Sequence, residues 1–197
     1  MASYRAVEAT CEAVVRLLQQ SWRSELFDHT DLQFAVYRTK DFDNPMEVGI
    51  SLFLYRVTLN SIQRTPPAKP AIGGRLRRPQ LPLDLHFLLM PWARSASLEQ
   101  FILGWLMRTI EDTPILPAGI LNTPSTPGVF EAEETVEIVF GQLSNEEMFR
   151  IWDVLPAKYQ ISVPYIARVV RIDSELERRE GGPVLSRELD FGTLKDW

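Results

Sequence analysis

Asp84 and His86 stand two positions apart, and they are the residues whose types could do acid–base chemistry. Residues i and i+2 of a β-strand share a face, so the pair could act as acid and base in a cleft, as in a small hydrolase. The alternative is a polar strand face on which His86 is hydrogen-bonded or meets another subunit. The sequence leaves both interpretations open.

Other reactive sites are not indicated. Neither His29 nor His86 has a second histidine or a cysteine at metal-ligand spacing. The two Gly-Gly pairs fit no nucleotide-binding pattern. The acidic residues near position 131 lack the spacing of a calcium loop, which favours a solvated face; they are Glu131, Glu133 and Glu134. We therefore expect no catalytic residue, no metal site and no cofactor.

Composition predicts one globular domain made in a reducing compartment. The chain has 197 residues, of which 45% are hydrophobic, and a formal net charge of −5. An acidic chain has no general attraction to nucleic acid or anionic membranes. Cys11 is the single cysteine and falls on an apolar helical stripe, which favours a buried thiol. No signal peptide or membrane-spanning run is visible, so we expect assembly in the cytoplasm.

Three segments have the pattern of helices. Apolar residues recur at helical spacing from Val7 to Leu18 and again from Ser97 to Asp112. Ser97 with Gln100 has the spacing of a capping box, as does Ser144 with Glu147, which opens the third helix. These helices must pack on whatever sheet the strands form.

Five segments have the pattern of strands, and they are residues 32–37, 48–60, 83–90, 134–140 and 160–172. Pro91 is expected to end the third strand or to mark an edge. The element order is α-β-β-β-α-β-α-β. Because strands follow one another without a helix between them, we predict an α+β fold with a mixed, largely antiparallel sheet and about three helices packed on it.

The second strand is apolar on both faces. Alternation puts Ile50, Leu52 and Leu54 on one face, and the residues on the other are Phe53, Tyr55, Val57 and Leu59. A strand of this kind is covered on both sides. The helices of the protein provide one cover, and a partner subunit could provide the other.

A segment rich in proline and basic residues follows, from Ser61 to Pro82. It contains no acidic residue, and its basic residues are Arg64, Lys69, Arg75, Arg77 and Arg78. A nucleic-acid clamp is one interpretation, but no aromatic residue is present to stack on bases. Contact with an acidic neighbouring subunit fits as well. Partner-binding residues are predicted at Arg75, Arg77 and Arg78.

The chain changes character after residue 175. Residues 1–175 are predicted to form the domain, and residues 176–197 an arm that docks on another protein. The arm is mostly charged but carries spaced apolar residues that are candidate anchors, namely Leu189, Phe191, Leu194 and Trp197.

Five blocks of the sequence resemble a known family. Residues 49–60, 81–89, 102–116, 134–147 and 164–172 are similar in order and spacing to the cap proteins of contractile injection systems, which resemble phage tail terminators. The blocks span roughly residues 5–175. The resemblance implies a terminator fold and a ring, expected to be a hexamer, that closes the inner tube and the contractile sheath. It implies no enzymatic activity and no cofactor.

The sequence leaves three hypotheses for the function. The leading hypothesis is a structural cap whose partners are its own copies and the sheath and tube proteins of a phage-tail-like particle, with neither a membrane nor nucleic acid as partner. The second is a nucleic-acid-binding accessory that acts through the basic segment. The third is a small hydrolase that uses Asp84 and His86.

Overall fold

The computed structural model describes residues 4–26, 29–63, 78–174 and 176. Six strands form one sheet in the order β1-β2-β3-β6-β5-β4. Their bounds are β1 Gln33–Tyr37, β2 Gly49–Leu59, β3 Leu81–Trp92, β4 Ile115–Pro117, β5 Thr135–Phe140 and β6 Val163–Ile172. The helices are α1 Ala6–Ser21, α2 Ala96–Asp112, α3 Ala118–Leu121 and α4 Asn145–Asp153, with 3₁₀ turns η1 Ser24–Leu26 and η2 Thr39–Asp43.

The strand pairing confirms the predicted mixed, largely antiparallel sheet. β1 runs parallel to β2, and the other four pairs are antiparallel. The connection from β1 to β2 holds only the turn η2. The strand order places β1 at one edge of the sheet. A side chain at Gly49 would collide with the Gln33 carbonyl oxygen, 2.2 Å from the Cβ position, so this glycine lets β1 approach β2.

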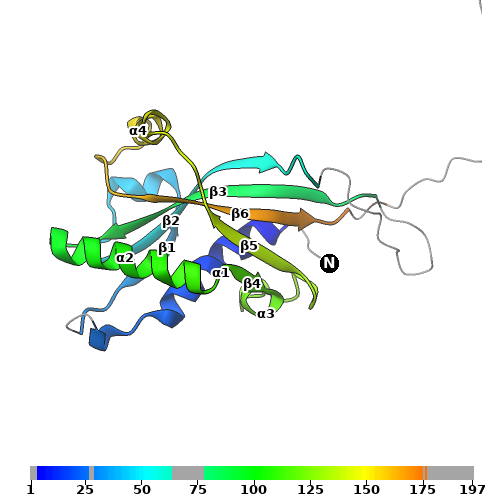
Figure 1. The fold of residues 1–197 in the computed structure, drawn as a ribbon, viewed down its shortest axis with the longest axis horizontal. Helices are drawn as coiled ribbons and strands as arrows, with labels where there is room; N and C mark the ends of the chain where they lie inside the picture. The colour runs from blue at the N-terminus through cyan, green and yellow to red at the C-terminus, as the bar shows by residue number, and fades with distance from the viewer. Residues whose placement is uncertain (1–3, 27–28, 64–77, 175, 177–197) are drawn as a thin grey trace, which may run out of the picture.

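The two faces of the sheet are covered differently. We call the face that carries Ile50, Leu52 and Leu85 the helix face, because these residues pack with buried residues of α1 and α2 in the main core. The opposite, outer face carries a smaller cluster around Leu88 and Met90, covered by η2 and α4. Figure 1 shows α4 on the other side of the strands from α1 and α2.

Two β-bulges change which side chains share a face. Tyr55 and Arg56 together oppose His86, so Val57 and Leu59 pair with β3 residues of the helix face. The prediction that Val57 and Leu59 face away from Ile50 is therefore wrong, because the extra residue reverses the alternation. The second bulge lies in β6, where Val169 has a φ of 59°.

The predicted second cover of β2 is also partly corrected. The outer face of its first half is covered by η2 and α4 of the same chain, not by a partner subunit. Beyond the bulge, the strand is exposed: Val57 is 45% and Leu59 54% accessible.

Details of the helix ends and strand bounds sharpen the sequence predictions. The capping box of Ser144 and Glu147 is present. The second helix, however, is capped by Ser95, whose hydroxyl accepts from the Leu98 N–H, and not by Ser97. Pro91 neither ends β3 nor lies in an edge strand. The Pro91 carbonyl accepts a hydrogen bond from the Gln160 side chain, on the side of β3 that faces β6. The N–H that proline lacks would point to the same side, where the pairing of β3 with β6 has already ended at Leu89.

Two short elements, β4 and α3, occupy a stretch expected to be loop, and the remaining order is as predicted. Within the described part of the chain, no helix has both the length and the apolar character that crossing a membrane requires.

Candidate interaction surfaces

Asp84 has a structural role at the point where the sheet extends beyond the helices. Its carboxylate accepts two bonds from the Asn60 side-chain amide, each 3.0 Å, and one from the Val169 N–H at 3.0 Å. The Asn60 side-chain oxygen in turn accepts the main-chain N–H groups of Ile62 and Gln63. Asp84 therefore fastens the turn that follows β2 to the bulge in β6.

His86 shares the outer face with Asp84, as predicted, but bonds to a different group. Its Nε2 lies 3.0 Å from the Thr58 hydroxyl, and its ring packs beside Tyr55. Burial, followed by the charge of Arg56, lowers the pKa of His86 below its usual value. Because the Asp84 carboxylate is bonded to Asn60 and Val169 instead, the two residues do not form an acid–histidine couple.

Cys11 is buried as predicted, with 5% of its surface accessible. Burial, and to a smaller extent the neighbouring Glu12, raises the pKa of its thiol to about 12. The thiol is protonated at neutral pH and is a poor nucleophile. Among the described residues, no group of three or more His, Cys, Asp or Glu side chains is placed to hold a metal ion.

The predicted partner-binding residues lie mostly outside the described residues, and these are Arg75, Arg77, Leu189, Phe191, Leu194 and Trp197. Arg78 is described and exposed, and its main-chain N–H donates to the Leu176 carbonyl at 3.2 Å. Residues 78 and 176 therefore lie side by side at the extending end of β3 and β6.

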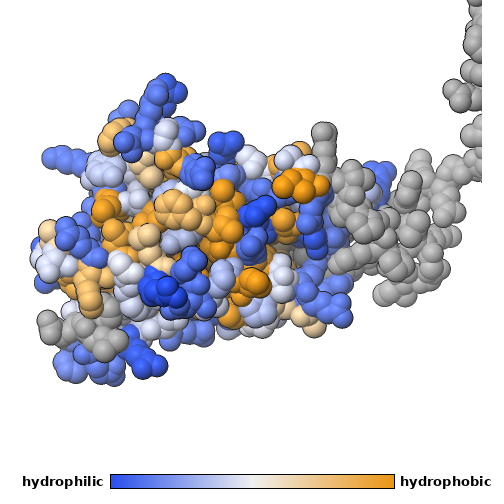
Figure 2. Space-filling view, viewed as in Figure 1, coloured by the Kyte–Doolittle hydropathy of each residue, from blue (hydrophilic) through white to orange (hydrophobic). Residues whose placement is uncertain are grey.

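Exposed apolar residues gather in two parts of the sheet. At the end of the sheet near Asp84, Val57, Leu59 and Leu81 are 45–54% accessible. Val57 and Leu59 pair with Leu85 and Leu83 of the helix face, and alternation along β3 places Leu81 on the same face. Phe140, the last residue of β5, is 56% accessible. Figure 2 shows hydrophobic side chains gathered over β5 and β6 in the middle of the molecule. Contiguous apolar patches of several hundred Å² often mark contacts with other proteins, so these residues are candidates for such contacts.

An apolar groove that the sequence did not predict lies between α1 and β1. Its volume is about 680 Å³. Val7, Cys11 and Val15 of α1 line one side, and Phe34 and Val36 of β1 line the other. The apolar stripe of α1 was visible in the sequence, but only the pairing order reveals that β1 is an edge strand and leaves part of that stripe uncovered.

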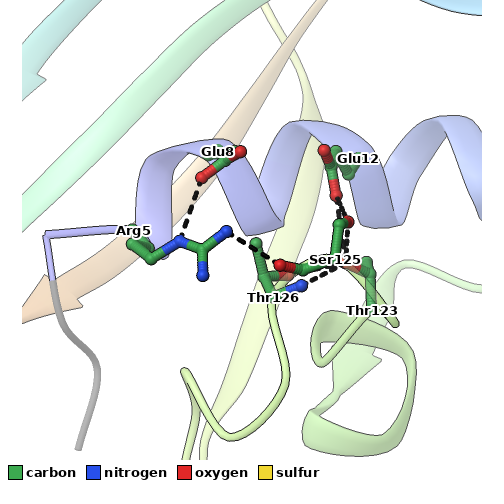
Figure 3. Close-up of polar contacts among 6 residues, drawn as sticks. All are labelled: Arg5, Glu8, Glu12, Thr123, Ser125 and Thr126. Carbon is green, nitrogen blue, oxygen red and sulfur yellow. Dashed lines mark hydrogen bonds and ion pairs between the residues drawn. The ribbon is translucent and has the colours of Figure 1, made fainter.

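Residues 123–125 also line the groove, and a network of hydrogen bonds holds them against α1. Glu12 accepts hydrogen bonds from the hydroxyls of Thr123 and Ser125, and Arg5 donates to the Ser125 carbonyl at 2.8 Å (Figure 3). The Thr126 N–H donates to the buried Thr123 hydroxyl, which fixes the turn itself. These bonds hold residues 123–125 against α1, where they line the groove.

Comparison with known proteins identifies the family. The family model of the Pvc16 N-terminal domain matches residues 9–186 of this chain. The chain belongs to the Pvc16 N-terminal domain family. The resemblance to cap proteins of contractile injection systems, noted from the five sequence blocks, is thereby confirmed. A comparison with curated proteins found no match.

Two solved structures share the fold. One is the sheath/tube terminator of an extracellular contractile injection system, PVC, in the extended state, with a TM-score of 0.63 and 14% identity. The other is the tube-terminating cap of the anti-feeding prophage, with a TM-score of 0.59 and 14% identity. The alignments cover 96% and 91% of this chain. The chain spans 64% and 59% of the length of those two proteins.

Proposed function

We propose that this chain is a structural, non-catalytic cap that ends the inner tube and the contractile sheath of a phage-tail-like injection system. The observation that carries the proposal is the family match over residues 9–186, together with the terminator fold that the chain shares with two solved caps. The two alternatives find less support: Asp84 and His86 are bonded separately, and the two solved structures are named as terminators of a tube or sheath.

The cap works as a ring of identical copies, which we propose to be a hexamer. A closed ring needs two different surfaces on each copy, one that fits the other. The exposed residues Val57, Leu59 and Leu81 and the groove beside β1 are candidates for contacts with neighbouring copies. The ring assembles in the cytoplasm and remains part of the assembled particle.

Gene deletion and microscopy test the cap directly. Without the cap, tube and sheath have no stop, so particles of variable length or of low stability are expected in electron micrographs of the deletion strain. Rings are expected in negatively stained preparations of the purified protein. Particles of normal length and stability in the deletion strain would overturn the proposal.

The arm is tested by removing residues 176–197. We expect the truncated chain to fold, because residues 6–172 build the buried clusters on both faces of the sheet, and to attach to the sheath or tube more weakly. Circular dichroism checks the fold, and co-sedimentation with particles checks attachment. Unfolding of the truncated chain would mean that the segment belongs to the core.

The basic segment is tested by changing Arg75, Arg77 and Arg78 to alanine together. If these residues meet an acidic neighbouring subunit, the variant should form rings that dissociate at lower salt than those of the unchanged protein. A DNA mobility-shift titration at low salt is the control. A salt-dependent shift that the triple variant loses would favour the nucleic-acid alternative instead.

A further inference from the structure

We infer that two β-bulges, one on either side of β3, act together as a bend that sets the direction of one end of the sheet, and that ring assembly depends on this direction. We call this end the sheet tip: residues 57–59 of β2, 81–83 of β3 and 170–172 of β6. The dependence of assembly rests on the proposed ring, whereas the bend is a property of the single chain.

The two bulges lie at neighbouring positions along β3. In β2, the extra residue lies opposite His86. In β6, Arg168 and Val169 together oppose Asp84. Each bulge bends its own strand and increases the local twist. Because both strands that pair with β3 bend at the same level, the sheet tip turns as a whole relative to the rest of the sheet.

Asp84 and His86 each hold one bulge from the outer face. The Asp84 carboxylate accepts the Val169 N–H at 3.0 Å. The His86 ring packs beside Tyr55 in the β2 bulge, and its Nε2 lies 3.0 Å from the hydroxyl of Thr58, which is on the tip side of that bulge. The two side chains whose types suggested acid–base chemistry therefore share a structural role, which is to fix the bend from the strand between the two bulges.

The backbone of Val169 indicates that the bend is imposed by its surroundings. The φ of Val169 is 59°, in the left-handed region that a β-branched residue rarely adopts. Strain of this kind persists only where neighbouring contacts hold it, and it gathers at functional positions. The contact that holds it here is the bond to Asp84, which also accepts two bonds from Asn60. An unfavourable conformation kept inside a strand therefore points to a function for the bend.

Further polar bonds join the strands of the sheet tip to one another. The Gln80 side chain, just before β3, donates to the carboxylate of Asp173, just after β6, at 2.6 Å. Arg171 of β6 donates to the side-chain oxygen of Gln63, which follows β2, at 2.7 Å. A connected polar network of this kind makes a segment rigid. A change of angle at the bulges should therefore move the sheet tip and its exposed apolar side chains as a unit.

Deletion of Arg56 tests the bend without turning any side chain of the sheet tip to the other face. Without Arg56, Tyr55 alone opposes His86, and Val57 still pairs with Leu85. The deletion therefore removes the bulge and keeps the alternation beyond it. Arg56→Ala is the matched control, because it removes the charge of this exposed side chain and retains the bulge.

The bulge in β6 gives an independent pair of variants. Deletion of Val169 leaves Arg168 alone opposite Asp84 and retains the later pairs of β6 with β3. Val169→Gly is the matched control, because glycine adopts a positive φ without strain and the extra residue stays in place. If one deletion variant fails to fold, the pair of variants at the other bulge still tests the bend.

Spin-label distances in the full chain measure the direction of the sheet tip. Ser61→Cys places one label just after β2, and Ser97→Cys places the other near the start of α2; both positions are exposed. Excess unlabelled chain limits the signal to distances within one chain, and the buried Cys11 of the unchanged protein is the labelling control. We expect the distance distribution to shift in both deletion variants and to stay unchanged in the two substitution controls. Sedimentation velocity should show rings for the controls and none for the deletion variants.

The possible outcomes separate this inference from the proposed cap function. A shifted distance together with loss of rings supports the inference. An unshifted distance in a folded deletion variant, rings that survive a shifted distance, loss of rings in Arg56→Ala, or failure of both deletion variants to fold overturns it. In these four cases the unchanged protein still forms rings, so the cap function stands. Absence of rings in the unchanged protein contradicts the proposed ring instead, and the spin-label distances then decide whether the bulges set the direction of the tip.

Discussion

The two ends of β2 lie in the same strand and have opposite surroundings. At the first end, Ile50 and Leu52 are at most 1% accessible, with α1 on one side and the cluster under α4 on the other. At the second end, Val57 and Leu59 are about half exposed and extend beyond the helices. The bulge at Tyr55 separates the two ends.

The difference shows how one strand serves both stability and assembly. The covered end contains the packing that stabilises the monomer. The open end keeps its shape through polar bonds, chiefly those of Asp84 to Asn60 and Val169, and this leaves its apolar side chains available for contact. Substitutions at the covered end should therefore affect folding, whereas those at the open end should affect assembly.

The largest effect is expected from Leu52→Ala. Leu52 is fully buried, so the substitution should reduce the free energy of unfolding by about 2–5 kcal/mol in urea titrations. Leu59→Ala is the matched control at the open end and should change it by less than about 0.5 kcal/mol while weakening ring formation. Equal losses of stability at the two positions would remove the distinction between the two ends.

Asp84→Ala should have the next largest effect, because it leaves the Asn60 amide and the Val169 N–H without their acceptor. We expect a loss of about 1–3 kcal/mol in the free energy of unfolding. Asp84→Asn retains one carbonyl acceptor and should lose less. Hydrogen exchange at the Val169 amide reports the same bond directly. Unchanged exchange in Asp84→Ala would show that the carboxylate does not hold the bulge.

Ser144→Ala tests α4, the helix that covers the outer face at the first end of β2. The Ser144 hydroxyl accepts from the Glu147 N–H at the start of α4, so its loss should cost about 1 kcal/mol. Ser144→Thr retains the hydroxyl and should cost less. If ring formation falls while stability stays unchanged, α4 is a contact surface rather than a cover.

How far the sequence predicts this fold depends on the range of the interactions. The helical stripe of α1 and the capping box at Ser144 are local patterns, and both predictions are confirmed. The bulges were missed because an extra residue such as Tyr55 looks like an ordinary member of an alternating strand. Val169 gave no signal either, since valine rarely adopts a positive φ.

The candidate sites show the same limit. Asp84 and His86 were correctly placed on one face, but their bonding partners Asn60 and Thr58 come from β2 and the turn after it, so only the pairing of β2 with β3 shows that the two residues act separately. The groove could not be predicted because it depends on β1 being an edge strand, which is a property of strand order.

The smallest effect is expected from protonation of His86. Burial, and then the positive charge of Arg56, lowers the pKa of His86 in the folded chain. The unfolded chain therefore binds this proton at a higher pH than the folded chain does. As the pH falls through the usual histidine range, about 6.5, the folded state loses stability, and it regains stability as the pH rises. His86→Gln should remove this part of the pH dependence.

Urea titrations of both proteins at several pH values between about 5 and about 8 measure the effect. Because His86 bonds to Thr58 just beyond the bulge, the acid-induced loss belongs to the open end. Hydrogen exchange should therefore increase first in the second half of β2 and remain slow around Leu52. Uniform loosening along the whole strand at low pH would mean that the two ends of β2 unfold as one unit, and that the bulge does not separate them.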